Sequence, residues 1–393
     1  MGLPECLARI DERDEEIHAW SFIDRTAEGG EGALSGVVLG VKDVIDVVGM
    51  PTTYGSPIFA TNIAAEDASA VAFLRAAGAI VLGKTVTAEF ATYHPGPTVN
   101  PRKLGHTPGG SSSGSAAATA DGQADIALGT QTAGSMIRPG SFCGTLAFKP
   151  TFGRYPLDGV LETAPSLDTL GLFSRNLQLL ITADSELSGQ HDMPERQKPL
   201  RVGVCKMSGW NMASTEMREA LTDFAKLLND ADCALKEIVL PSAFGLLEDA
   251  QALIHRYEAS QSLGQIRHQY SSDVSDAFRA MIDSGEATSE ADYRSAKIVQ
   301  VECQKLMTEV FFDIDLLLAP GALGAAPEGI NATGDPIFQR IWTAVGAPCL
   351  GFPVTWRSDG LPLGLQVIGL PGTDRQLLSN AGLLVELVAF REV

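Results

Sequence analysis

Apolar and polar positions along the chain switch repeatedly between helical and strand spacing. Near the N-terminus, helical spacing over residues 5–17 is followed by alternation over 17–23, where His18, Trp20 and Phe22 share one face of a predicted strand. The next predicted elements are a buried strand at Gly36–Val41, a helix at Ala68–Ala77 that Gly78 ends, and a short strand at Ala79–Leu82. Strands that alternate with helices indicate the α/β class.

The rest of the chain divides into a small-residue segment and long helical patterns. Residues 95–145 are rich in Gly, Ser, Thr and Ala with little periodicity, and this stretch is too long for a passive loop, so we expect a functional loop system. Helical patterns with charged faces cover 210–235 and 244–310. The remaining predictions are strands at Ala234–Leu240, Cys349–Trp356 and Leu363–Ile368 and a helix at Asp374–Phe390.

Composition and charge narrow the classes of partner. The 393 residues are 45% hydrophobic and 20% charged, as in ordinary globular proteins. With 29 Lys and Arg against 48 Asp and Glu, the net charge of −19 repels phosphate backbones and anionic lipids, so we expect neither nucleic acid nor membrane partners. The apolar stretch 341–356 is shorter than the ~20 residues of a spanning helix and contains Pro348 and Pro353.

Location and metal content follow from what the sequence lacks. The N-terminal stretch has no basic region followed by an apolar run, so we expect no secretory signal and a cytoplasmic protein. Six scattered cysteines form no CxxC pair, and six histidines show no HxH or HExxH spacing. We therefore expect reduced thiols, no disulfide framework and no metal site.

Two short motifs suggest chemistries that their surroundings oppose. Residues 78–85, GAIVLGKT, fit the phosphate-binding pattern GxxxxGK[ST], but a helix precedes them and their interior is a core strand, which argues against a nucleotide site. Residues 110–114, GSSSG, fit the nucleophile elbow GxSxG, which needs a hydrophobic strand leading into its serine. The preceding NPRKLGHTP cannot be that strand.

A third set of residues is a better candidate for catalysis. Lys42 ends a predicted strand, a serine-rich loop covers Gly109–Ser115, and Gly129–Ser135 reads GTQTAGS. Small residues at Ala133 and Gly134 let backbone N–H groups approach an incoming atom, as in an oxyanion hole. A serine directly after such donors is positioned as a nucleophile.

These three segments together resemble the amidase signature hydrolases. Lys42 in GVKD matches the family's general base, Ser111 in PGGSSSGSAA its bridging cis serine, and Ser135 in GTQTAGSMIRP its acyl-forming nucleophile. Thr130 matches a family threonine near the nucleophile, which makes it a candidate for supporting the site, with satisfying a backbone group as the alternative. The resemblance is strong over about 36–172 and weaker over 333–369.

The resemblance implies a fold and a domain plan. We expect a single large α/β domain over 1–393, with a central mixed, twisted sheet covered by helices on both faces. Its signature core would span about 36–172, a helical cover about 205–310, and C-terminal strands and a helix about 333–393 that return to the core.

The resemblance also implies a reaction without metal or cofactor. Neutral Lys42 takes a proton from Ser111, which takes one from Ser135, and Ser135 attacks an amide to release ammonia and later the acid. Lysine can be neutral near pH 7 only if burial or neighbouring positive charge lowers its pKa by ~2 to 3 units. Lys84, the rival base, is interpreted as structural. The oxyanion would be held by backbone N–H groups of Thr132, Ala133, Gly134 and Ser135.

Several departures from the usual family pattern point to a substrate. Ser113, Gln131 and Ala133 replace more usual residues, and Arg138 lies three positions past the nucleophile. This pattern resembles the malonamidase branch, which implies that Arg138 binds the carboxylate of a malonamate-like amide. Two alternatives stay open: an amidase for neutral or aryl amides, and an amidotransferase-like subunit of a complex. A homodimer is also expected from the family.

Overall fold

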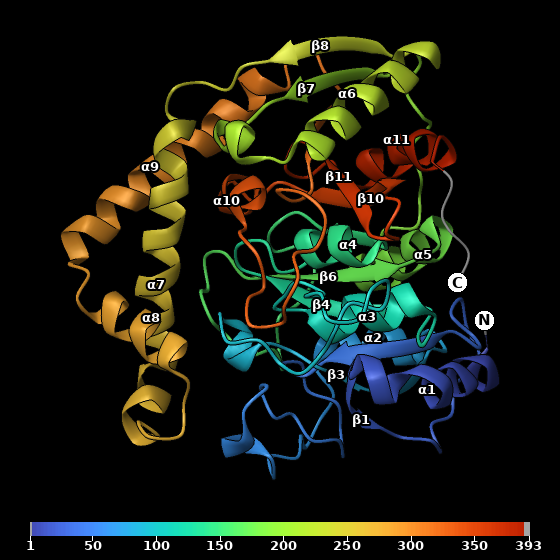
Figure 1. Cartoon of the computed structure of the whole chain (residues 1–393), viewed down its shortest axis with the longest axis vertical. Coiled ribbons are helices and arrows are strands. Elements are labelled where there is room, and N and C mark those ends of the chain that lie inside the picture. Colours follow the sequence, from blue (N-terminus) through green and yellow to red (C-terminus); the bar gives the residue numbers. More distant parts are fainter. Residues whose placement is uncertain (1, 389–393) are drawn as a thin grey trace.

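One mixed sheet runs through the whole molecule. The computed structural model describes residues 2–388, in which eleven strands follow the order β1-β3-β2-β4-β6-β5-β10-β11-β9-β7-β8 (Figure 1). β2 is parallel to β3 and β4, and β7 is parallel to β8 and β9, while the central pairs are antiparallel. The strands are β1 (Trp20–Ile23), β2 (Val38–Lys42), β3 (Ile80–Thr85), β4 (Ile126–Gln131), β5 (Leu146–Lys149), β6 (Thr169–Ser174), β7 (Arg201–Cys205), β8 (Ala234–Ile238), β9 (Leu316–Pro320), β10 (Cys349–Trp356) and β11 (Pro362–Ile368).

Helices flank this sheet, and three of them extend to one side. In Figure 1, α7, α8 and α9 stand beside the sheet, and α7 packs against both of the others and against α10. Serine caps begin α6, α8 and α9, where each hydroxyl accepts a backbone N–H of the first turn. The helices are α1 (Leu3–Ile17), α2 (Ser69–Ala76), α3 (Ser113–Asp121), α4 (Ile137–Cys143), α5 (Leu177–Ser188), α6 (Thr215–Asp230), α7 (Phe244–Gln269), α8 (Asp276–Glu286), α9 (Glu290–Val310), α10 (Ile337–Ala344) and α11 (Asp374–Glu386).

The core is continuous from the N-terminal strands to the C-terminal ones. Leu39, Leu128, Phe148 and Phe352, from four different strands, are at most 1% exposed and belong to one hydrophobic cluster. Burial of apolar surface is the main favourable term in folding, and here it joins distant parts of the sequence. The predicted α/β class and single large domain with a mixed sheet are therefore confirmed.

The predicted loop system at 95–145 is wrong in part. This segment contains α3, β4 and α4. All nine residues of α3 are buried, and most of them are small. The helix therefore has no exposed polar face opposite an apolar stripe, and its sequence shows no helical period. His18 also differs from prediction, because it is the left-handed cap of α1 rather than part of a strand face with Trp20. The predicted end of the last helix at Phe390 lies outside the described residues.

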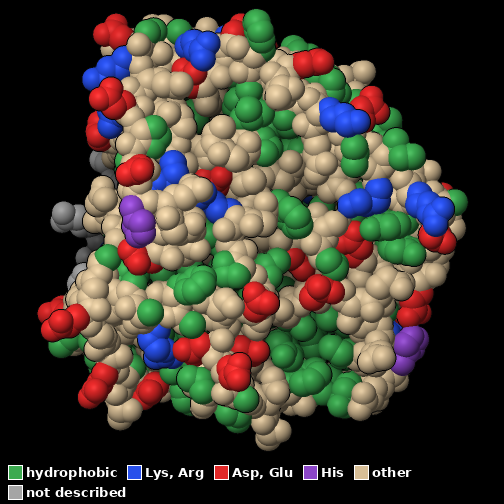
Figure 2. Space-filling view, turned by 180° about the vertical axis from the view of Figure 1, so that it is seen from behind, with side chains coloured by type: hydrophobic (Ala, Val, Ile, Leu, Met, Phe, Trp, Pro, Cys, Tyr) green, Lys and Arg blue, Asp and Glu red, His purple; other side chains and the backbone are tan. Residues whose placement is uncertain are grey.

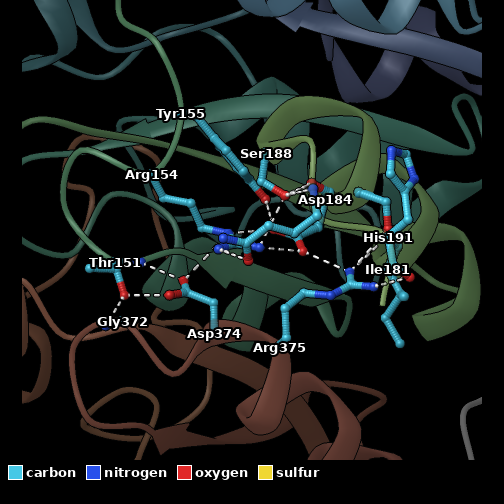
Figure 3. Close-up of polar contacts among 12 residues, drawn as sticks. Thr151, Arg154, Tyr155, Ile181, Asp184, Ser188, His191, Gly372, Asp374 and Arg375 are labelled. Atoms are coloured by element: carbon cyan, nitrogen blue, oxygen red, sulfur yellow. Dashed lines mark hydrogen bonds and ion pairs between the residues drawn. The ribbon is translucent and has the colours of Figure 1, made fainter. Parts of the chain in front are cut away.

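A buried ion-pair network fastens the C-terminal helix to the body of the domain (Figure 3). Asp184 of α5 accepts hydrogen bonds from Arg154 at 2.8 and 2.9 Å, from the Tyr155 hydroxyl at 2.6 Å and from Arg375 of α11 at 2.9 Å. Asp374 lies 3.8 Å from the same Arg154. Because every charge has a partner, the cluster satisfies its buried groups and serves the fold.

The surface reflects the acidic composition. On the face shown in Figure 2, acidic side chains are scattered and basic ones are separate from each other. No described helix is both long and apolar enough to cross a membrane.

Candidate active site

Lys42 lies at the end of a fully buried strand and points to two hydroxyl groups. Its Nζ donates hydrogen bonds to Ser111 Oγ at 2.8 Å and to Thr130 Oγ1 at 2.7 Å. Burial lowers the pKa of Lys42 to about 7, while the nearby Asp168 carboxylate opposes that shift. A large share of Lys42 is therefore neutral at neutral pH and able to accept a proton.

The two predicted serines lie on adjoining loops. Ser111 precedes α3, follows a cis peptide bond from Gly110, and is 1% exposed. Ser135 is partly exposed, and its carbonyl accepts a hydrogen bond from the Ser112 amide at 3.3 Å. Lys42 and Ser111 are thus buried, and Ser135 is the one of the three predicted triad residues that is partly exposed.

The backbone carbonyls of residues 132–135, here called the 132–135 loop, are all occupied. Four different parts of the chain donate to these four carbonyls, so the peptide planes are fixed from the carbonyl side. The donors are Gln251 Nε2 to Thr132 at 2.9 Å, Thr343 Oγ1 to Ala133 at 2.8 Å, the Arg138 amide to Gly134 at 3.3 Å and the Ser112 amide to Ser135 at 3.3 Å.

The amides of the same loop are available to a ligand. Within residues 2–388, no group accepts a hydrogen bond from the N–H groups of 132–135, whereas the amides of Met136 and Ile137 donate to Gln131 Oε1. Gly134 is required here, because a Cβ would lie 2.7 Å from Pro336 and 2.9 Å from Arg138. Clustered N–H donors of this kind stabilise an oxyanion.

Arg138 is buried beside this loop with one nitrogen unused. Its Nε donates to the Thr333 carbonyl at 2.6 Å, and one terminal nitrogen donates to the Gly110 carbonyl at 2.7 Å. The other, NH1, is buried without a hydrogen-bond partner among the described residues. Burial, with the charge of Arg340, lowers the pKa of Arg138 to about 10, so the group stays cationic at neutral pH. A buried cationic donor without a partner favours an anionic ligand.

Three supporting residues escaped sequence analysis. Gln251 and Thr343 fix the 132–135 loop, and Asp168 accepts hydrogen bonds from the Thr132 hydroxyl at 2.6 Å and from the amides of Thr163 and Ala164 at 2.8 Å. Burial raises the pKa of Asp168 to about 6. Gln251 could have been found from the sequence as a polar residue on the apolar side of a helical pattern.

Lys84 has a different environment from Lys42. Its Nζ lies 3.1 Å from Asp43 Oδ1 and donates to Thr52 Oγ1 at 2.8 Å. This partnered position agrees with a structural role for Lys84. The phosphate-loop motif around it is the buried strand β3, which leaves no loop to enclose a phosphate.

The nucleophile-elbow alternative also fails on geometry. Ser112, the serine of GSSSG, is fully buried, and its Oγ donates to the Thr130 carbonyl at 3.1 Å. A nucleophile elbow presents its serine to substrate. Among the described residues, no three His, Cys, Asp or Glu side chains are grouped so as to hold a metal ion.

Known proteins match this fold along nearly all its length. The family model named Amidase matches residues 5–378, so the chain belongs to the amidase family, whose enzymes act on amide C–N bonds. A solved structure described as the crystal structure of amidase superposes with a TM-score of 0.90 at 28% identity, covering 98% of this chain and 95% of that one.

Curated relatives have a more specific name. A protein of Thermus thermophilus is 30% identical, with 95% of this chain and 91% of the relative covered, and one of Halothermothrix orenii is 29% identical, with 95% and 90% covered. The names of both relatives describe them as subunits of a glutamyl-tRNA(Gln) amidotransferase.

Proposed function

We propose that the protein is an amidohydrolase that cleaves a small linear amide to an acid and ammonia through Ser135, Ser111 and Lys42. The observation that carries this proposal is the buried Lys42 with its lowered pKa, 2.8 Å from Ser111 Oγ. A buried, largely neutral lysine is a base, and a serine needs one to become a nucleophile. The family assignment supports the amide as the reacting group.

The proposed steps pass protons from Ser135 to Ser111 and from Ser111 to Lys42. Ser135 Oγ attacks the amide carbon as its proton passes to Ser111 Oγ, whose own proton passes to Lys42 Nζ. The amides of the 132–135 loop hold the tetrahedral oxyanion, and each such donor is typically worth about 3 kcal/mol of barrier. The protons return through Ser111 to the leaving nitrogen, and the C–N bond breaks to give ammonia and an acyl-enzyme. Water then follows the same route and releases the acid.

We propose further that the substrate carries a carboxylate close to the amide, as malonamate does. Support comes from Arg138, whose NH1 has no partner in the described chain and lies on the side of the loop where a Gly134 side chain would be. In a chain of net charge −19, an anionic substrate needs a local cation of this kind.

A second candidate is an amidotransferase subunit that works in a complex. The names of the curated relatives favour it. Both candidates use the same serine chemistry and differ in whether the chain alone hydrolyses a free small amide. Ammonia release by the purified chain favours the amidohydrolase, whereas activity that appears only with partner proteins favours the amidotransferase.

Labelling tests the nucleophile directly. A fluorophosphonate should form its adduct on Ser135, located by mass spectrometry, and Ser135→Ala should abolish both the adduct and ammonia release. Ser112→Ala is the matched control, because this neighbouring serine is buried and bonded to a carbonyl. An adduct on Ser112 would overturn the assignment.

A further inference from the structure

A second arginine, Arg340, lies one helical turn after Pro336, and Pro336 and Arg138 NH1 both lie within 3 Å of the point that a Gly134 side chain would occupy. Within residues 2–388 neither Arg138 nor Arg340 forms an ion pair, although the chain contains 48 acidic residues. Arg340 lowers the pKa of Arg138, while the exposed Asp335 raises it. His255 is 4% exposed, and both of its ring nitrogens lack partners in the described chain. Burial, together with Arg340, lowers its pKa to about 3, so the imidazole is uncharged. Two guanidinium groups therefore lie here without an ion-pair partner among the described residues, and the exposed Asp335 is the acidic side chain whose charge acts on Arg138.

Arg138 alone cannot grip a carboxylate with both ends of its guanidinium group. Its Nε and one terminal nitrogen are committed to Thr333 and Gly110, which leaves NH1. A carboxylate has two oxygens that accept hydrogen bonds, so a second donor is needed for its full recognition. Arg340 is half-buried. In the described structure one nitrogen of its guanidinium group donates a hydrogen bond, to Gln251 Oε1 at 2.9 Å.

Gln251 connects this second cation to the 132–135 loop. The glutamine is fully buried in α7, accepts from Arg340 through Oε1 and donates through Nε2 to the Thr132 carbonyl, each at 2.9 Å. The two contacts fix which end of the amide faces the loop. Without Arg340, the amide could rotate and present its oxygen to the Thr132 carbonyl, which repels it.

We propose that Arg340 is the second cation for the substrate's carboxylate and that Gln251 is a positioning residue through which Arg340 sets the 132–135 loop. The proposal rests on the proposed function. Arg340 would touch the substrate and determine specificity, whereas Gln251 would act on the reaction through the Thr132 carbonyl. A carboxylate seated on Arg340 holds the guanidinium in place, and the loop amides are then aligned for the oxyanion.

The first experiment separates charge recognition from general damage. Wild type and Arg340→Gln are compared on malonamate and on propionamide, a neutral amide of similar size. Loss of a charged hydrogen bond predicts a fall in kcat/KM of about tenfold or more on malonamate. Propionamide should lose only the part of the rate that depends on Gln251, so the ratio of kcat/KM for malonamate to that for propionamide should still fall, and Arg340→Lys should recover part of it. Equal losses on both substrates, or a wild type that prefers propionamide, would overturn the role of Arg340.

The second experiment concerns positioning. Gln251→Leu should lower kcat by at least about tenfold on both amides, because complete loss of one oxyanion donor lowers kcat by more than about tenfold. KM should stay within about twofold. Gln123→Leu is the control: Gln123 is another fully buried glutamine, and its side chain accepts from Trp20 Nε1 at 2.7 Å and donates to Asp121 at 3.1 Å rather than to the 132–135 loop. Equal kcat values in the two variants, with both proteins folded by circular dichroism, would overturn the role of Gln251.

Labelling separates a failure of this inference from a failure of the proposed function. If wild type takes no fluorophosphonate at Ser135 and releases no ammonia, the proposed function and this inference both fail. If wild type is labelled and active on malonamate, but Arg340→Gln has the substrate ratio of wild type and Gln251→Leu has the kcat of its control, the inference alone is wrong.

Discussion

The kcat/KM of the enzyme should depend on the fraction of Lys42 that is neutral. Burial moves the pKa of this lysine from 10.5 to about 7, which corresponds to about 5 kcal/mol of disfavoured charging at about 1.4 kcal/mol per unit. The side chain is fully buried, so this figure needs no reduction for solvent screening. The neutral form is the base, so kcat/KM should rise with pH through about 7 and level off above it.

The fall in kcat/KM at low pH should follow the neutral fraction of Lys42. Neutral Lys42 makes up about a tenth of the enzyme at pH 6 and about a hundredth at pH 5, so kcat/KM should fall by these factors. Asp168, with its pKa raised to about 6, becomes protonated in the same range, and because its charge raises the pKa of Lys42, losing that charge should make the fall shallower below pH 6. Replacing it by asparagine removes a charge that raises the pKa of Lys42, and the rising limb should move to lower pH.

The assay is the initial rate of ammonia release from propionamide between pH 5 and 9.5 at constant ionic strength. A neutral amide is chosen so that only groups of the enzyme titrate. Circular dichroism at each pH checks that the protein stays folded. A rising limb centred near 10, as for an exposed lysine, or a profile without a limb in this range, would refute the assignment of Lys42 as the base.

Three further substitutions test other parts of the structure. Lys84→Met should lower the free energy of unfolding by about 3 to 5 kcal/mol in urea titrations, because it leaves the Asp43 carboxylate buried without its cation; an unchanged midpoint would contradict this. Arg138→Leu should reduce kcat/KM about 10- to 150-fold more for malonamate than for propionamide, which also suffers because the side chain holds the Gly110 and Thr333 carbonyls, and equal losses would mean that Arg138 is structural. Thr343→Val removes the donor to the Ala133 carbonyl, so kcat should fall about tenfold while labelled Ser135 is still formed; a kcat like that of wild type would show that this contact is dispensable.

The sequence was most informative where residue type alone carries the constraint. Lys42, Ser111 and Thr130 could be placed near one another because their motifs resemble those of the amidase signature family, and the strands with strong apolar patterns, such as β2 and β11, were predicted close to their observed bounds. Small residues around Gly134 indicated an open approach to backbone amides, and a side chain there would indeed meet Pro336 and Arg138. The strand patterns and the small residues around Gly134 are local, so a single sequence contains them.

Features that depend on distant contacts could not be read in this way. Helix α3 lacks an apolar stripe because it is buried on every side, so periodicity gave no sign of it. Gln251 and Thr343 look like ordinary helical residues, and only folding brings them to the carbonyls of Thr132 and Ala133. The commitment of most of the Arg138 guanidinium to Gly110 and Thr333 is equally invisible in the sequence.

The four clamped carbonyls also bear on when during synthesis the enzyme becomes active. A growing chain contains the base and both serines once residue 135 has been made, but two of the donors that fix the loop are at positions 251 and 343. The reactive serine therefore exists long before its oxyanion site does. If the proposed mechanism holds, a nascent or truncated chain would carry a nucleophile that cannot stabilise its own intermediate, and we expect hydrolysis only after α7 and α10 have docked.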